Sequence, residues 1–134
     1  MTVNKIEVRN VYKVFGNREK AVLAMIRAGK SKDQVLAETG CVVGINDISL
    51  SIRAGEVFVI MGLSGSGKST LVRHLNRLID PSSGQILVDG EDILDYDMPA
   101  LRHFRRHKIS MVFQNFGLLP HRNVLDNVAY GLKV

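Results

Sequence analysis

The most informative stretch of this chain is Val57-Phe58-Val59-Ile60-Met61-Gly62-Leu63-Ser64-Gly65-Ser66-Gly67-Lys68-Ser69-Thr70. Its first five residues are all apolar, which predicts a short strand buried on both faces. From residue 69 to residue 78, apolar side chains recur three or four positions apart, and this period predicts an amphipathic helix. The glycine-rich turn between the two matches the pattern G-x-x-x-x-G-K-[ST] in full. The stretch therefore predicts a strand, a phosphate-binding loop and a helix, in that order.

The residue types of this loop are those that a polyphosphate requires. Gly65 and Gly67 remove side chains that would hold the backbone N–H donors away from phosphate oxygens, and the N-terminus of the following helix adds positive potential. In a loop of this kind Lys68 reaches the β- and γ-phosphates, the Ser69 hydroxyl ligates Mg²⁺ and Thr70 touches the α-phosphate. The alternative is a glycine-rich turn that binds no ligand. The expected nucleotide-binding residues are Gly62, Leu63, Ser64, Gly65, Ser66, Gly67, Lys68, Ser69 and Thr70.

Composition limits the class of protein. The 134 residues are 46% hydrophobic and 23% charged, as in one globular domain, which excludes disordered, collagen-like and low-complexity chains. A single cysteine, Cys41, excludes an internal disulfide framework and fits a reducing compartment. The apolar run at 57–61 is too short to span a bilayer, and the first residues lack the pattern of a secretory signal. We therefore expect neither a transmembrane segment nor secretion.

The charge of the chain points to an anionic partner without choosing one. The net charge is +5, which suits nucleic acid, phosphates or an acidic membrane surface. Basic residues are densest at 102–108, where a solvated helix face is the simpler interpretation.

Periodicity predicts the remaining elements. Alternating apolar residues predict strands over 5–15 and 45–53, and Asp89-Gly90 predicts a hairpin turn between strands 85–88 and 92–94. The apolar run at 109–113 predicts another buried strand. Helices are expected over 21–28, 32–39 and 99–107, with a further one beginning at Asn123; Ser31 and Gln34 have the spacing of a capping box before the second.

Three segments in register resemble the nucleotide-binding subunit of ABC transporters, and the resemblance covers the whole chain. Residues 57–70 resemble the strand and Walker A loop of that family, 83–90 its following hairpin, and 111–121 its Q-loop region. The resemblance implies an α/β fold, namely the P-loop NTPase core of an ABC ATPase with an antiparallel β-subdomain. It also implies ATP and Mg²⁺ as cofactors and ATP hydrolysis coupled to transport.

More narrowly, the chain resembles the glycine betaine/proline (quaternary amine) uptake branch, which imports osmoprotectants. Relative to a generic ABC ATPase, residues 17–44 are an insertion. The sequences of residues 31–40, 75–79 and 118–127 are similar to those of that branch. The substrate rests on resemblance alone, because ATP never meets the transported solute. There are three alternatives. The insertion is a neutral feature that other substrate branches share, the chain is an ABC ATPase for another substrate, or it is a basic, non-catalytic nucleic-acid-binding module.

The resemblance also assigns residues outside the loop. Phe15 falls on the aromatic residue that stacks on adenine; a core role for Phe15, with Tyr12 as the stacking residue, is the alternative. Gln114 matches the Q-loop glutamine, whose amide contacts Mg²⁺ or the attacking water. The expected catalytic residues are thus Lys68 and Gln114, and the expected metal ligands are Ser69 and Gln114.

The expected partners follow from the same resemblance. A transmembrane permease would dock on the Q-loop region at 114–127, where Phe116, Leu118 and Leu119 suit either an interface or the core. A second ATPase subunit would complete a homodimer, and a periplasmic or lipid-anchored substrate-binding protein would belong to the same system. No nucleic-acid partner is expected. The implied location is peripheral, at the cytoplasmic face of the plasma membrane.

Several parts of the family's machinery have no counterpart in these residues. The signature motif, the Walker B carboxylates and the switch histidine are absent. None of the four histidines has neighbours in the sequence that suggest a metal ligand or a catalytic base. We therefore expect residues 1–134 to be the N-terminal part of a nucleotide-binding domain, incomplete at its C-terminus, which binds nucleotide without efficient hydrolysis. Strands 57–61 and 109–113 would lack their usual neighbours and expose apolar faces, so we expect marginal stability.

Overall fold

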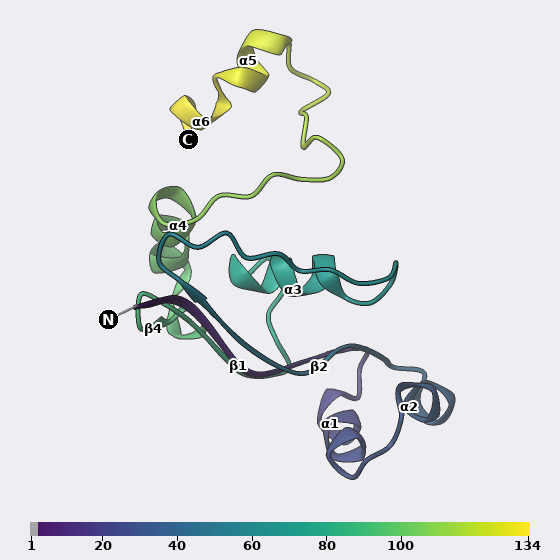
Figure 1. Ribbon diagram of the computed structural model, residues 1–134. Coiled ribbons are helices and arrows are strands. Elements are labelled where there is room, and N and C mark those ends of the chain that lie inside the picture. The colour runs from purple at the N-terminus through teal and green to yellow at the C-terminus, as the bar shows by residue number, and fades with distance from the viewer. Residues whose placement is uncertain (1–2) are drawn as a thin grey trace.

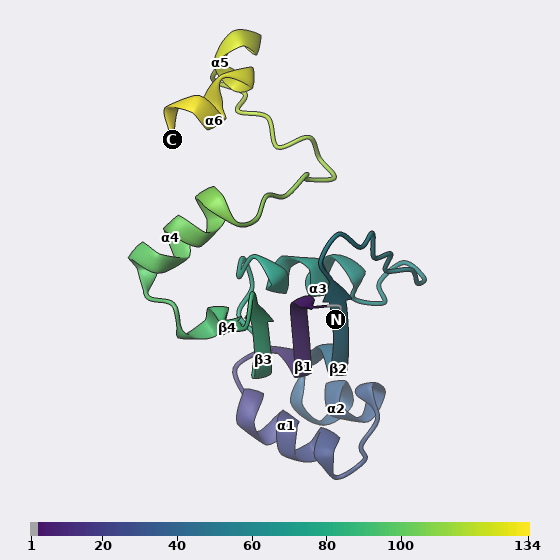
Figure 2. The ribbon, with the colours of Figure 1, turned by 60° about the vertical axis from the view of Figure 1, so that its left-hand side comes forward.

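A computed structural model describes residues 3–134, and an antiparallel sheet forms its centre. The sheet contains β1 (Asn4–Phe15), β2 (Val42–Arg53), β3 (Ser83–Val88) and β4 (Glu91–Asp92), in the spatial order β2-β1-β3-β4 (Figure 1). Helix α3 (Lys68–Leu75) lies along one face of this sheet in both ribbon views (Figures 1 and 2). The expected hairpin turn at 89–90 joins β3 to β4.

The main core lies between the sheet and the helices that follow it. Ile86 and Val88 of β3 point to this side, as do Val8 and Val11 of β1, whose alternation is interrupted by the irregularity at Asn10. Leu71 of α3 and two residues of α4 (Met98–His107), Leu101 and Phe104, pack against them. The buried members are Val8, Val11, Ile45, Leu71, Ile86, Val88, Ile93, Leu101 and Phe104.

A second core lies beneath the other end of the sheet, where α1 (Glu19–Arg27) and α2 (Lys32–Thr39) pack (Figure 2). The predicted capping box is present: Gln34 N donates to Ser31 Oγ at 3.2 Å, and Ser31 N donates to Gln34 Oε1 at 2.9 Å. Gly40 ends α2 in the left-handed conformation. The buried members of this second core are Val14, Val22, Leu23, Val35, Cys41 and Val43.

Several boundaries differ from the sequence prediction. Strand β2 begins at Val42 rather than at 45, because Phe15 at the end of β1 pairs with Val42. The second strand of the predicted hairpin, expected over 92–94, is β4 (Glu91–Asp92) and ends early, because Asp92 Oδ1 accepts a hydrogen bond from Leu94 N at 3.0 Å and caps a 3₁₀ turn, η1 (Ile93–Asp95). The helix expected over 69–78 ends at Leu75.

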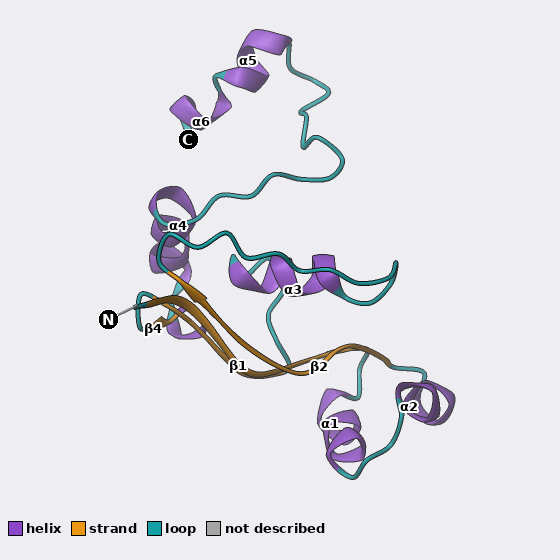
Figure 3. Cartoon of the chain, in the orientation of Figure 1, coloured by secondary structure: helices purple, strands orange, loops and turns teal. Residues whose placement is uncertain are grey.

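The two predicted buried strands at 57–61 and 109–113 are wrong as strands. Both segments are loops within the described chain (Figure 3), and they expose Val57 to 90% and Val112 to 97%. A strand needs a neighbour that accepts and donates its backbone hydrogen bonds. The described residues provide no such neighbour for either segment, so the apolar residues stay extended but unpaired.

The last part of the chain leaves the sheet. After α4, residues 108–123 form an extended path that carries α5 (Val124–Val128) and α6 (Tyr130–Lys133) away from the rest (Figures 1 and 2). Asn123 caps α5, as the sequence predicted, since its side chain accepts a hydrogen bond from Asp126 N at 2.8 Å. Among the described helices, none has the length and apolar character needed to cross a membrane.

Candidate nucleotide-binding site

The glycine-rich loop folds around the lysine that was predicted to bind phosphate. Lys68 Nζ donates to the carbonyl oxygens of Gly62 and Leu63, each at 2.7 Å, and lies 3.4 Å from Ser66 Oγ. The ammonium group therefore lies on the Gly62 side of the loop. An anion there would replace neutral carbonyl partners with a charged one, and a charge-assisted hydrogen bond is the stronger of the two.

The loop also lies against the backbone of β2. Gly67 has φ +96°, and a Cβ on it would lie 2.7 Å from the Gly44 carbonyl oxygen. A side chain at this position would collide with backbone, which cannot move aside. Gly65, with φ +77°, faces open space instead. The two glycines thus have different roles: Gly67 permits close packing of the loop on the sheet, and Gly65 keeps the loop surface open.

Helix α3 begins directly after Gly67, and no side chain caps its N-terminus. The first residues of α3 line a hollow of about 280 Å³, which lies between the loop and the start of β2, and the first N–H groups of a helix have no partners within the helix. The hollow is lined by Phe15, Val42, Val43, Gly44, Gly65, Gly67, Lys68, Ser69 and Thr70. Five residues of the predicted loop and the predicted aromatic residue thus meet at one place.

Phe15 lies at the end of β1 with 40% of its surface exposed. Its ring covers Gly44, where a Cβ would approach Phe15 Cε2 to 2.6 Å, and Lys13 Nζ lies 5.4 Å from the ring centre. The alternative stacking residue, Tyr12, packs against the second core and beside Arg27 instead. Of the two aromatic residues, only Phe15 lines the hollow. Its stacking on adenine stays a prediction.

Gln114 is not brought to this hollow. It lies on the exposed segment between α4 and α5, as do Phe116 and Leu118, so its predicted contact with Mg²⁺ or water stays a prediction. The sequence did not single out Val42, Val43 and Gly44 as site residues. No motif marks them, because they reach the loop only through the pairing of β2 with β1.

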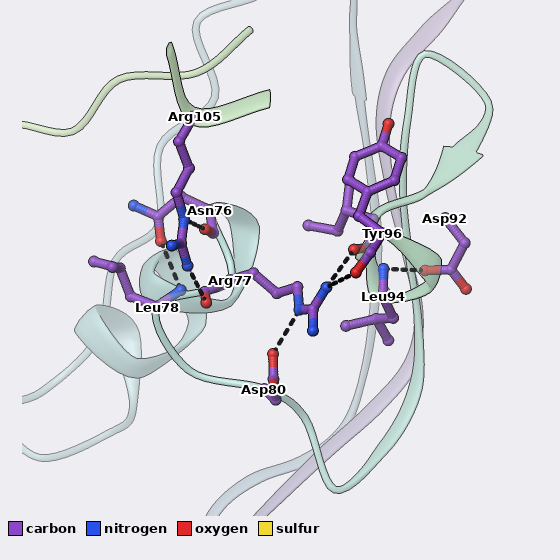
Figure 4. Close-up of polar contacts among 9 residues, drawn as sticks. Asn76, Arg77, Leu78, Asp80, Asp92, Leu94, Tyr96 and Arg105 are labelled. Carbon is purple, nitrogen blue, oxygen red and sulfur yellow. Dashed lines mark hydrogen bonds and ion pairs between the residues drawn. The ribbon is translucent and has the colours of Figure 1, made fainter. Parts of the chain in front are cut away.

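The C-terminal end of α3 is fixed by an arginine of the basic stretch 102–108. Arg105 Nε donates to the Asn76 carbonyl oxygen at 3.0 Å, and Arg105 Nη2 donates to the Arg77 carbonyl oxygen at 2.6 Å (Figure 4). These contacts satisfy carbonyl groups that a helix end leaves without partners. At least one charge of the stretch is therefore structural rather than part of a solvated face.

Arg77 continues the connection toward the hairpin. It has φ +56°, and its Nη1 donates to the carbonyl oxygens of Ile93 at 3.1 Å and Tyr96 at 2.9 Å, while its Nε donates to Asp80 at 2.8 Å (Figure 4). Helix α3 is thus held at both ends, by β2 at the loop and by two arginines at the far end.

His74 is fully buried in α3. Its Nδ1 lies 2.6 Å from the Thr70 carbonyl oxygen and donates to it in the neutral ring, while Nε2 has no partner within the described chain. Burial lowers the pKa of His74 from its usual 6.5. The ring is therefore a packing residue of α3, which agrees with the absence of ligand-like company in the sequence.

Comparisons with known proteins agree with this geometry. A protein-family model described as ABC transporter matches residues 45–133. The chain is 55% identical to the glycine betaine/proline betaine transport system ATP-binding protein ProV of Salmonella typhimurium, and 52% identical to the glycine betaine transport ATP-binding protein OpuAA of Bacillus subtilis. Each match covers 97% of this chain, and 32% and 31% of the two relatives.

Solved structures give the same class. The dimeric structure of MJ0796, a bacterial ABC transporter cassette, superimposes with a TM-score of 0.73 and 31% identity over 96% of this chain and 47% of that one. A post-hydrolysis state of the same cassette, bound to ADP and Pi, superimposes equally well, at 30% identity. The chain therefore belongs to the ABC transporter family of ATP-binding proteins, and the predicted fold class and family are confirmed. It spans about a third of the length of the curated relatives it matches.

Proposed function

We propose that this chain is the nucleotide-binding part of an ABC transporter ATPase subunit that energises the import of glycine betaine and proline-type osmoprotectants. The hollow that joins Phe15 to the glycine-rich loop carries the proposal, because it offers an aromatic face for a purine and backbone N–H donors for phosphates. The names of the relatives support the transported class.

The length of the matches favours this branch over others. The relatives named for transport of glycine betaine, carnitine or trimethylamine N-oxide match 96% or more of the chain, which includes the insertion at 17–44. Relatives named for phosphonate or methionine import match only 66% and 69% of it. These match lengths support the assignment of the chain to the branch that transports small methylated amines.

The proposed ligand is Mg-ATP. Lys68 would hold the β- and γ-phosphates, the Ser69 hydroxyl would ligate Mg²⁺, and Thr70 would contact the α-phosphate. Gln114 would contact Mg²⁺ or the attacking water once the segment that carries it lies beside the loop. Phosphoryl transfer consists mainly of such positioning and charge neutralisation, so these residues bind and orient the nucleotide rather than react with it.

The proposed partners are those of a binding-protein-dependent importer. A transmembrane permease would dock on residues 114–127, where Phe116 is 85% exposed and Leu118 is also exposed. A second copy of the ATPase and a periplasmic or lipid-anchored substrate-binding protein would complete the system. The location would be the cytoplasmic face of the plasma membrane.

Uptake of radiolabelled glycine betaine tests the proposal. The intact protein is expressed, together with its permease and binding protein, in cells that lack their own betaine transporters. We expect uptake that rises with medium osmolarity and is lost in Lys68→Ala, because that substitution removes the phosphate-binding cation. Failure of the wild type to support uptake, while a different labelled solute is imported, would contradict the assigned substrate.

A further inference from the structure

A cavity of about 380 Å³ lies between the β3–β4 hairpin and helix α4, and it shares no lining residue with the hollow at the glycine-rich loop. Its volume falls within the range of about 300–1,000 Å³ that is usual for small-molecule sites. The hairpin contributes Asp89 and Glu91, α4 contributes Phe104 and Lys108, and Tyr96 comes from the segment that joins the two. Charged and aromatic side chains from three places in the chain thus meet at one cavity.

One carboxylate of the lining has no cation beside it. The Tyr96 hydroxyl donates to Glu91 Oε2 at 2.6 Å, and Glu91 forms no ion pair with any described residue. The hydrogen bond to Glu91 raises the pKa of Tyr96 to about 12, so the phenol keeps its proton at neutral pH and remains the donor. The negative charge of Glu91 is therefore available to a cationic group of a ligand.

The other carboxylate of the lining has two cations. Asp89 Oδ1 lies 2.6 Å from Lys5 Nζ, and Asp89 Oδ2 lies 3.5 Å from Lys108 Nζ. The nearer lysine, Lys5, is enough to balance the charge of Asp89. Lys108 is exposed and more loosely held, so its ammonium group is free to donate to an anionic group of a ligand. His103 is the remaining polar residue of the lining.

Two aromatic rings lie beside these charges. The ring centres of Tyr96 and Phe104 are 5.8 Å apart, and their planes are inclined by 56°. Phe104 is only 3% exposed, so the core fixes its ring in place. Aromatic faces next to a carboxylate favour a methylated ammonium group, which binds through cation–π attraction. A primary ammonium group would instead need acceptors for three N–H donors.

We propose that this cavity binds a small zwitterion with a methylated ammonium group, of which glycine betaine is the simplest example. The ammonium group lies against Glu91 and the two rings, and the carboxylate of the ligand lies against Lys108. This site is additional to the proposed nucleotide site. Its ligand belongs to the class of solute that the proposed importer would deliver, although the lining alone carries the assignment.

Equilibrium dialysis of the intact protein with radiolabelled glycine betaine tests the proposal, and we expect saturable binding. Three unlabelled competitors probe the two charges and the methyl groups. Tert-butylacetate has carbon in place of the quaternary nitrogen, choline lacks the carboxylate, and glycine lacks the methyl groups. Each is expected to compete about threefold or more less strongly than unlabelled glycine betaine, because each loses one partly screened contact.

Two substitutions place the binding in the cavity. Glu91→Gln removes the charge but keeps an oxygen that accepts from the Tyr96 hydroxyl, and Lys108→Gln leaves Asp89 paired with Lys5. Each is expected to weaken glycine betaine binding by about threefold or more. Asp95→Asn is the matched control, because Asp95 is an exposed carboxylate of η1 that does not line the cavity.

Each outcome decides one question. Absence of saturable binding, or equal affinities of the wild type and both substituted proteins, would overturn the site. Competition by tert-butylacetate or glycine as strong as that by glycine betaine would overturn the assigned ligand class. If a substitution abolishes the thermal transition, the competitor series on the wild type decides alone. Saturable binding in a protein that fails to support betaine uptake would contradict the proposed function while the cavity site stands.

Discussion

At the scale of single residues, the glycine-rich loop and the helix that follows it depend on Gly67, which has no side chain, and on His74, whose side chain is buried. Gly67 approaches the Gly44 carbonyl oxygen so closely that a methyl group there would collide with backbone. His74 is buried in α3, with the Thr70 carbonyl oxygen beside one ring nitrogen and no described partner on the other. Both positions are therefore sensitive to small chemical changes.

Protonation of His74 is expected to destabilise the folded protein. Burial lowers the pKa of His74 below 6.5, and Lys13 lowers it further, while the Thr70 carbonyl and Asp80 oppose the shift. The unfolded chain therefore binds the proton more readily, so stability is full above about pH 6.5 and falls as the pH drops toward the folded-state pKa. We expect His74→Leu to flatten this dependence between about pH 5 and pH 7 in urea unfolding of the intact protein. The exposed His121→Leu is the control, and an unchanged slope in His74→Leu would contradict the argument.

At the scale of elements, helix α3 is shorter than its sequence pattern predicts, and its end is held by a residue distant in sequence. Apolar periodicity continues to residue 78, but the helix ends at Leu75. Arg105 binds the carbonyl groups of Asn76 and Arg77, and Asn76 Oδ1 accepts a hydrogen bond from Leu78 N at 3.2 Å. The local hydrogen bond and the left-handed Arg77 end the helix, and the Arg105 contacts connect that end to α4.

Removal of one side chain tests this connection. Arg105→Ala is expected to destabilise the protein by about 1–3 kcal/mol, because it leaves two partly buried carbonyl groups without their charged donor. Arg106→Ala, an exposed arginine of the same helix, is expected to change stability by about 0.5 kcal/mol or less. Both values come from denaturant unfolding of the intact protein. Equal effects of the two substitutions would show that Arg105 does not hold the end of α3.

At the scale of the whole molecule, the chain has two small cores and two apolar segments, 57–61 and 109–113, that reach the main core only through Ile60 and Ile109. Residues 57–59 and 112–113 are largely exposed although they are among the most apolar of the sequence. Their backbone N–H and C=O groups have no neighbouring strand among the described residues. Exposed, unpaired strands of this kind favour association between copies.

The isolated 134-residue chain is therefore expected to unfold over a broad temperature range. We also expect it to bind a hydrophobic dye such as ANS and to form soluble aggregates that light scattering detects, because the apolar segments stay accessible to solvent. A single sharp calorimetric transition, without dye binding, would show that the two cores suffice. Val57→Lys is expected to reduce aggregation without lowering the transition temperature, since this side chain is 90% exposed.

Features that depend on local spacing were predictable from the chain alone. The glycine-rich loop, the capping box at Ser31 and Gln34, the hairpin turn at 89–90 and the cap at Asn123 each involve residues within a few positions of one another, so their patterns are readable from the chain. The family followed from three such motifs in register, and the comparisons confirmed it.

The distant residues that share a site became evident only in the folded chain. Sequence patterns report the period of an element and not its neighbours, so they predicted strands at 57–61 and 109–113 whose hydrogen-bonding partners the described chain does not supply. The same limit hid the approach of Gly44 to the loop, which depends on β2 pairing with β1. The phosphate-binding loop is readable from the sequence because its residues are neighbours in the chain. Its surroundings are not, because they depend on the pairing of strands that lie far apart in the chain.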